Sequence, residues 1–341
     1  MPDRRHGLPL GPQGLIKRQL ATDAPVTETS CALFRLGEQC NNKCPMCTNT
    51  GLRELHFFAT DELVRRAEFL YQKGFTQVVL TGGEPTIHPG FFTVVERLQA
   101  HVMAWDINTH GRTFAGPGFA RRAREMGLRR AIVSLHSHEI AASCAMSGIR
   151  EDAHHETLAG IHALGAEGVA VTINCVISTY TVGKLRAFYD YCQTEFGPGC
   201  TVKLAFPSLF AQTPDFAPIQ LRYRDVGGEL RALVAHAAAC STALQLESVP
   251  CCVLDDPAAR NTGRFGFGET HYLDDRTGNR LFSMEWAEAQ NAVYPDRCTA
   301  CRAFASCPGV STRYARRHGV DELRPFARDL PWWHPGAGRS Q

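Results

Sequence analysis

The sequence lacks an excess of charge of either sign. Among its 341 residues, 36 Lys and Arg side chains nearly balance 34 Asp and Glu side chains, which leaves a formal net charge of +2. So small a net charge gives no global attraction to nucleic acid or to an anionic membrane surface. We therefore expect no nucleic-acid partner and look for function in particular residues.

Long apolar runs are also missing. No stretch reaches the roughly eighteen apolar residues that a membrane-spanning helix needs. The N-terminus, Met-Pro-Asp-Arg-Arg-His-Gly, carries basic residues but no apolar segment after them, so it is not a secretory signal. These two absences predict a protein without membrane association.

Cysteine, by contrast, is abundant, with 14 residues. A secreted disulfide scaffold would be shorter and denser in cysteine, whereas the spacings CxxxCxxC and CxxC are typical of metal or cluster ligation. Both arguments favour a reducing compartment, and we expect a cytoplasmic protein. Five cysteines without ligand spacing are predicted to be small buried hydrophobes: Cys31, Cys144, Cys175, Cys192 and Cys200.

The most informative cysteines are Cys40, Cys44 and Cys47, which read Cys-Asn-Asn-Lys-Cys-Pro-Met-Cys. Three thiolates on one short loop can hold three irons of a four-iron four-sulfur ([4Fe–4S]) cluster and leave the fourth iron without a protein ligand. Ordinary ferredoxin sequences supply a fourth cysteine instead. A zinc site is the alternative, but zinc usually takes four ligands arranged in CxxC pairs.

A second segment, Thr-Gly-Gly-Glu-Pro at 81–85, directly follows the apolar run 78–80. Together and in this order, the two segments resemble the radical S-adenosylmethionine (SAM) enzymes. The resemblance implies that the open iron binds the amino and carboxylate groups of SAM. It also implies that an electron from the cluster cleaves SAM to give a 5′-deoxyadenosyl radical, and that a flavodoxin or ferredoxin supplies this electron.

Short apolar runs of β type alternate with helical patterns along the chain. The expected strands are 32–36, 77–80, 104–108, 131–135, 169–177 and 202–206, and the expected helices are 61–73, 91–100, 119–126, 155–164 and 182–196. This alternation predicts an α/β fold with a parallel sheet and helices outside it. Six such units match the partial (β/α)6 barrel that the resemblance implies.

After residue 206 the pattern becomes irregular, and only 221–243 reads as a helix. We therefore predict four parts. They are an N-terminal arm at 1–28, the radical SAM partial barrel at 29–215, a helix with a small α+β auxiliary-cluster domain at 216–324, and a tail at 325–341.

Residues at the C-terminal ends of barrel strands face the mouth of the barrel, where ligands bind. Gly82 and Gly83 permit a close approach to a ligand and a positive φ, and Glu84 offers a carboxylate beside them. The resemblance implies that this segment, including Pro85, binds the SAM amino group.

Later strand ends supply more candidates. By resemblance, Thr109, Ser134 and Asn174 also contact SAM; for Thr109 and Ser134 the alternative is a hydrogen bond to backbone at a strand end. His110 stands where the family often has asparagine. His136 is a candidate catalytic residue, because a histidine at a barrel mouth can bind substrate or move protons. Its alternative is a polar residue on the rim.

The C-terminal cysteines Cys298-x2-Cys301-x5-Cys307 resemble the core of the SPASM module, a C-terminal extension of many radical SAM enzymes. The full module continues with another cysteine, where this chain has Ser311. The resemblance therefore implies one auxiliary [4Fe–4S] cluster, as in the smaller twitch variants. A closed cluster of this kind suits electron transfer, and zinc is the alternative.

The fourth auxiliary ligand is predicted to be Cys251 or Cys252. Neighbouring residues usually cannot both point into one cluster, so one thiol of the pair is expected to be free. A free thiol near the barrel mouth would give a hydrogen atom to a substrate radical and invert a carbon centre. The alternative is a cysteine that simply packs in the module.

The expected reaction is hydrogen-atom abstraction from an unactivated C–H bond. SPASM relatives mostly modify ribosomally made peptides, so we predict the maturation of a peptide natural product. One-cluster relatives act on aminoglycosides or nucleotides, which makes a small-molecule dehydrogenase or epimerase the alternative. A non-enzymatic iron–sulfur electron carrier or scaffold would differ from both by failing to cleave SAM.

Overall fold

The computed structural model describes residues 15–17, 25–51, 55–209, 213–240, 242–258, 269–273 and 280–327. Most of the predicted N-terminal arm and C-terminal tail lies outside these ranges. No helix within the described ranges is both long and apolar enough to cross a membrane.

One large sheet forms the centre of the described structure, in the order β10-β9-β2-β3-β4-β5-β6-β7-β8. Neighbours are parallel throughout, except that β10 is antiparallel to β9. The strands are β2 (Cys31–Arg35), β3 (Gln77–Thr81), β4 (Ala104–Thr109), β5 (Leu128–Ser134), β6 (Ala170–Val176), β7 (Thr201–Ala205), β8 (Leu244–Glu247), β9 (Thr270–Leu273) and β10 (Leu281–Ser283). The predicted α/β fold with a parallel sheet is confirmed, and all six expected strands are present.

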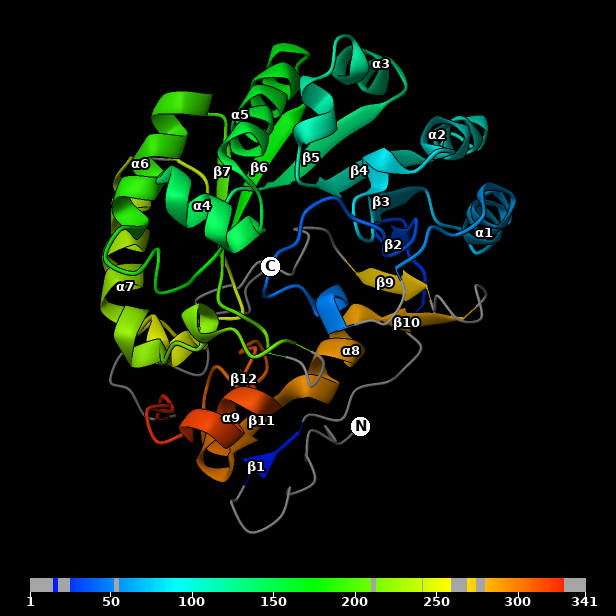
Figure 1. Ribbon diagram of the computed structural model, residues 1–341. Coiled ribbons are helices and arrows are strands. Elements are labelled where there is room, and N and C mark those ends of the chain that lie inside the picture. Colours follow the sequence, from blue (N-terminus) through cyan, green and yellow to red (C-terminus); the bar gives the residue numbers. More distant parts are fainter. Residues whose placement is uncertain are drawn as a thin grey trace, which may run out of the picture.

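Helices follow the strands and cover the outer side of the sheet (Figure 1). They are α1 (Thr60–Gln72), α2 (Phe91–Ala100), α3 (Phe119–Glu125), α5 (Glu151–Ala166), α6 (Leu185–Phe196) and α7 (Tyr223–Ala239). Helix α4 (Ile140–Ser147) lies instead beside the loop that follows β2, and its Met146 packs with Leu209 and Ile219 apart from the main core. The short α4 was not expected, because its sequence, IAASCAMS, has no helical spacing of apolar residues.

Alternation along each strand separates the two faces of the sheet. Val202 and Leu204 of β7 belong to the main hydrophobic core beneath the helices. Lys203 lies between them and, by the period of two, points to the inner face of the barrel. The inner face therefore carries polar side chains that a close-packed core would not tolerate without partners.

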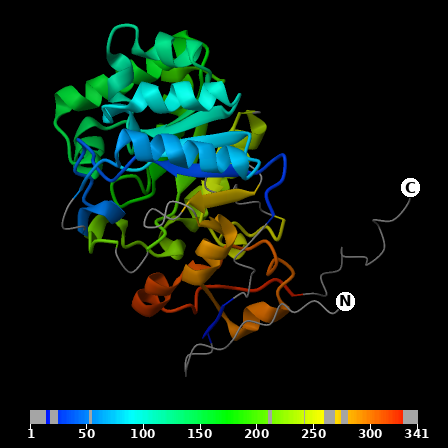
Figure 2. The same ribbon diagram turned by 90° about the vertical axis from the view of Figure 1, so that its right-hand side faces the viewer.

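The C-terminal region contains α8 (Met284–Asn291), α9 (Thr312–His318) and a small antiparallel sheet of β1 (Leu15–Ile16), β11 (Ala292–Pro295) and β12 (Val310–Ser311). Figures 1 and 2 show it on one side of the large sheet, opposite α3 and α5. Strands β8, β9 and β10 lie within 216–324 yet extend the barrel sheet at its two edges. The large sheet therefore crosses the domain boundary predicted at residue 215.

Candidate functional site

The cysteine loop follows β2 and holds Cys40, Cys44 and Cys47 in half-buried positions. Its backbone is fixed by a bond from the Cys47 N–H to the Cys44 carbonyl at 3.0 Å. Burial raises the pKa of the Cys40 thiol to about 11 and that of Cys44 to about 12. Because ligation requires thiolates, a bound metal centre would have to supply the positive charge that stabilises them. Three such thiols on one loop fit a cluster with one open iron.

The C-terminal end of helix α4 packs directly against this loop. The Lys43 N–H donates to the Ser147 carbonyl at 3.3 Å, and the Cys44 thiol lies 3.4 Å from the same oxygen. Gly148 follows with φ of +60°, and a Cβ there would stand 2.0 Å from the Lys43 carbonyl oxygen. The backbone of the loop and the end of α4 therefore touch directly, and only glycine allows this contact.

Gly82 and Gly83 bring the end of β3 against the chain that leads into the cysteine loop. The Gly83 N–H donates to the Gly37 carbonyl and the Glu84 N–H to the Gln39 carbonyl, both at 2.9 Å. A Cβ on Gly83 would stand 2.1 Å from the Gln39 oxygen. The two glycines thus leave space for the backbone of residues 37–39, and Gly82 has the positive φ that the sequence indicated. A contact of this segment with SAM stays a prediction.

This backbone contact predicts that Gly83→Ala destabilises the fold by about 1–3 kcal/mol, because overpacked backbone has to shift. Thermal unfolding measures the change. The matched control is Gly165→Ala in α5, where a Cβ meets nothing within 4 Å and the substitution should gain about 0.5–1 kcal/mol. Equal melting temperatures for Gly83→Ala and the wild type would contradict the argument.

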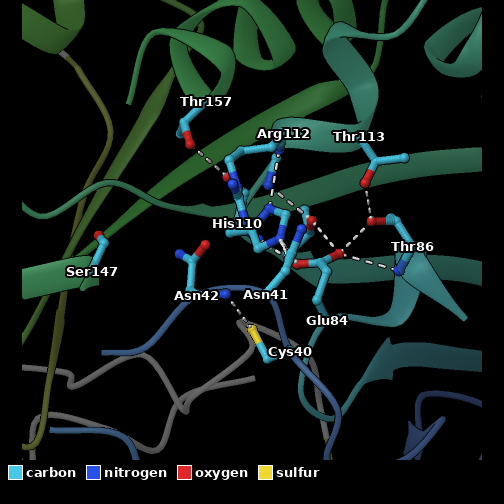
Figure 3. Close-up of polar contacts among 12 residues, drawn as sticks. Cys40, Asn41, Asn42, Glu84, Thr86, His110, Arg112, Thr113, Ser147 and Thr157 are labelled. Carbon is cyan, nitrogen blue, oxygen red and sulfur yellow. Dashed lines mark hydrogen bonds and ion pairs between the residues drawn. The ribbon is translucent and has the colours of Figure 1, made fainter. Parts of the chain in front are cut away.

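Glu84 ties the ends of β3 and β4 together (Figure 3). Its carboxylate is buried, and Oε1 accepts from the Thr86 hydroxyl at 2.6 Å and the Thr109 hydroxyl at 2.8 Å. Oε2 accepts from the His110 N–H at 2.7 Å. Protein donors thus occupy the carboxylate, and the hydroxyl of Thr109 is oriented by it. A contact from either residue to SAM stays a prediction.

His110 connects this network to the cysteine loop. Its Nδ1 accepts from the Arg112 N–H at 3.1 Å, so the ring proton is on Nε2, which faces Asn41 Oδ1 at 2.6 Å (Figure 3). Burial lowers the pKa of His110, which keeps the ring neutral. The sequence marked His110 as a departure from the family, but it gave no sign that Asn41, between the first two cysteines, is the partner.

Ser134 and Asn174 are register neighbours on β5 and β6 and lie half-buried. His136, just beyond β5, is buried, and desolvation lowers its pKa to about 4. Its Nδ1 accepts from the Val176 N–H at 3.3 Å. The His136 ring is therefore neutral near pH 7. Its Nε2–H can donate a hydrogen bond, but the ring is not a protonated acid at that pH.

An ion pair on the inner face was missed by sequence reasoning. Lys203 of β7, in register with Asn174, lies 2.5 Å from Glu247 of β8, and both side chains are largely buried. Glu247 belongs to a strand that the sequence did not predict, so no pattern could have paired the two residues.

The C-terminal cysteines share one small pocket. Cys251, Cys252, Cys298, Cys301 and Cys307 line it together with apolar residues such as Phe304, Leu323 and Phe326. Within the described ranges, no three His, Cys, Asp or Glu side chains converge closely enough to hold a single metal ion. The auxiliary cluster, like its zinc alternative, therefore stays a prediction.

The two neighbouring cysteines differ in their surroundings. Cys251 is buried, and its contact with Cys307, followed by desolvation, raises its thiol pKa strongly. Cys252 is half-buried, and it packs against the main core of the barrel. Cys251 thus contacts Cys307, while Cys252 lines the same pocket and interacts electrostatically with Cys298, so both thiols lie beside the three C-terminal cysteines.

Comparison with known proteins gives a family match for most of the barrel. Residues 34–192 match the model of the Radical SAM superfamily. The chain is similar to the GTP 3′,8-cyclase of Caulobacter vibrioides, with 29% identity over 174 residues, which are 49% of this chain and 48% of that protein. It is also similar to a probable GTP 3′,8-cyclase of Thermococcus kodakarensis, with 31% identity over 33% of this chain and 36% of that protein. The chain thus spans less than half the length of these relatives.

Solved structures share the fold at low sequence identity. Streptococcus suis SuiB bound to S-adenosylmethionine has a TM-score of 0.56 and 12% identity, over 78% of this chain and 60% of that chain. Native anSMEcpe with bound AdoMet has a TM-score of 0.53 and 12% identity, over 84% of this chain and 80% of that chain. The matched range 34–192 contains both the cysteine loop and the network around Glu84.

Proposed function

Because residues 34–192 of this chain form a radical SAM domain, we propose that the protein reductively cleaves SAM and abstracts a hydrogen atom from an unactivated C–H bond of a second molecule. The observation that carries the proposal is the link from the cysteine loop through Asn41 and His110 to Glu84. This link fixes the proposed cluster ligands relative to the strand ends where SAM is expected.

In this proposal Cys40, Cys44 and Cys47 hold the cluster, and Ser134 and Asn174 contact SAM from the inner face. The cluster and SAM together supply the electron transfer and the 5′-deoxyadenosyl radical. The protein's part is to position the reactants and to exclude water from the barrel. The test is anaerobic incubation of the iron-loaded chain with SAM and dithionite, which should release 5′-deoxyadenosine and methionine. No release would reject the proposed enzyme and favour an electron carrier or scaffold.

We further propose one auxiliary [4Fe–4S] cluster in the C-terminal pocket, held by Cys298, Cys301, Cys307 and Cys251. The shared apolar pocket and the contact of Cys251 with Cys307 support this ligand set. An apolar shell limits solvent access, which is one of the ways in which a protein sets a cluster's reduction potential.

A ribosomally made peptide is the proposed substrate, on the resemblance of the C-terminal cysteines to the SPASM module. The relatives named GTP 3′,8-cyclase favour a nucleotide as the second candidate. Adding GTP to the SAM-cleavage reaction separates the two. GTP that is consumed in step with 5′-deoxyadenosine release would reject the peptide, and GTP that is left intact would reject GTP as the substrate.

Cys252 is the proposed spare thiol, so Cys251→Ala and Cys252→Ala should differ. The first should lose up to about four irons, because a closed cluster needs its fourth ligand. The second should keep its iron but lose turnover if Cys252 gives a hydrogen atom to the substrate radical. Iron analysis and product formation in deuterium oxide measure both effects. Full turnover by Cys252→Ala, with no solvent deuterium in the wild-type product at the reacting carbon, would show that the thiol only packs.

A further inference from the structure

The N-terminal strand β1 belongs to the C-terminal region, although most of the chain separates the two. Leu15 and Ile16 pair antiparallel with Pro295 and Tyr294 of β11. In Figure 1 the dark blue β1 lies beside the orange β11. The first described residues of the chain therefore complete the small sheet that contains the C-terminal strands β11 and β12.

The two residues of β1 face opposite sides of this small sheet, as the period of two in a strand requires. Leu15 is buried in the main hydrophobic core, together with Val293 of β11. Ile16 is only 4% exposed and is buried instead in a second apolar cluster with Tyr294 and Phe304. Strand β1 therefore joins the main core on one side and this separate cluster on the other.

The second cluster forms one wall of the pocket that contains the C-terminal cysteines. Tyr294 and Phe304 line this pocket, and Cys298 and Cys301 pack against the cluster. The rings of Tyr294 and Phe304 meet edge to face, with centroids 5.0 Å apart. Ile16 is buried with these rings but does not line the pocket, so it lies in the layer behind them.

Hydrogen bonds connect the two aromatic residues of this wall to the cysteines. The Tyr294 hydroxyl donates to the Cys307 carbonyl oxygen at 3.0 Å, and the Phe304 N–H donates to the Cys301 carbonyl oxygen at 3.1 Å. Gly309 allows the Tyr294 ring to lie close, because a Cβ at that position would stand 2.7 Å from its Cζ. A shift of either aromatic residue would therefore move the backbone that carries a cysteine.

We propose that Ile16 is a positioning residue of the C-terminal cysteine pocket: it holds Tyr294 and Phe304 in place, and these residues limit the access of solvent to the thiols. The inference goes beyond the proposed function, because it applies equally to a pocket that holds an iron–sulfur cluster and to one that holds zinc. Removing buried atoms from a close-packed wall leaves a cavity that its neighbours fill only in part. A smaller residue at position 16 should therefore open this pocket without opening the barrel.

The first measurement is the rate at which each cysteine of the full chain, purified without metal, reacts with iodoacetamide, followed by mass spectrometry of its peptides. In Ile16→Ala, Cys298 and Cys301 should react at least about tenfold faster than in the wild type, because truncation of a buried isoleucine costs more free energy than a tenfold change in an equilibrium requires. Two thiols serve as internal references. The exposed Cys240 should react rapidly in every variant, and the buried Cys175 should stay unreactive as long as the barrel is folded.

The matched control is Ile161→Ala in α5, which removes the same atoms from a side chain that is 2% exposed in the main core. This variant should lower the melting temperature but leave the alkylation rates of Cys298 and Cys301 unchanged. Ile16→Val loses a single methyl group, so its rates should rise only about threefold. If Ile16→Ala does not fold, the comparison of Ile16→Val with Ile161→Val decides the question in the same way.

The second measurement follows the loss of metal from the loaded full chain to an excess of a chelator. Metal in the C-terminal pocket should leave Ile16→Ala roughly tenfold faster than the wild type, whereas metal on Cys40, Cys44 and Cys47 should leave at an unchanged rate. An unchanged alkylation rate, or an equal acceleration by Ile161→Ala, would overturn the inference. A wild type without metal in this pocket would reject the proposed auxiliary cluster instead, and the alkylation rates would still decide the role of Ile16.

Discussion

Replacing any one of Cys40, Cys44 or Cys47 by alanine should reduce the release of 5′-deoxyadenosine to the level of a control without protein. A cluster bound by only two thiolates loses the arrangement of three held irons and one open iron. Chromatography of the products after anaerobic incubation with SAM and dithionite measures the effect. The control is Cys240→Ala, because Cys240 is exposed at the end of α7 and has no ligand spacing.

These losses are expected to come from lost ligation and not from misfolding. The bonds that fix the loop run between backbone atoms, from the Cys47 N–H to the Cys44 carbonyl and from the Lys43 N–H to the Ser147 carbonyl. Alanine keeps both. The melting temperature of each variant without iron should therefore stay close to that of the wild type. SAM cleavage that persists in any of the three variants would refute the ligand assignment.

Much of the fold could be predicted because its central strands contain short runs of buried apolar residues, which mark strands of a largely buried sheet. The run 78–80 and its counterparts mark β3 and the other five strands, and strong turn signals separate them. Strands β8 and β9 could not be predicted. Each is four residues long and joins an edge of the sheet formed by distant segments, a choice made by tertiary packing.

The candidate site likewise has features that the sequence could predict and features that it could not. The spacing of the cysteines and the Gly-Gly-Glu segment each lie within a few consecutive residues, so both can be recognised in the sequence. The contact of His110 with Asn41 joins side chains 69 positions apart, and the pair Lys203–Glu247 depends on a strand that was not expected. The small size of Gly83 is visible in the sequence, but the close approach of the backbone before Cys40 is not, because it depends on how β3 meets a separate segment.

The full chain should bind about eight iron and eight sulfide, since two separate groups of cysteines each suit a four-iron cluster. One group lies in the loop after β2, and the other lines the C-terminal pocket. The two groups share no residue, so their losses should add. Replacing Cys40, Cys44 and Cys47 together should leave about half of the iron, and replacing Cys298 and Cys301 together should leave the other half.

Iron and zinc analysis of the purified variants decides between an auxiliary cluster and its alternative. The variant that lacks the loop cysteines isolates the C-terminal pocket, because all metal that remains must be held there. About four irons in that variant would support a closed cluster suited to electron transfer. One zinc ion and no iron would show that the pocket is a structural site, because zinc has no redox chemistry. The substrate radical would then not lose its electron to a cluster in this pocket, and hydrogen-atom transfer from a thiol such as Cys252 would become the favoured end of the reaction. That transfer breaks the S–H bond, forms the C–H bond and leaves a thiyl radical, which the external electron donor would have to reduce with uptake of a proton.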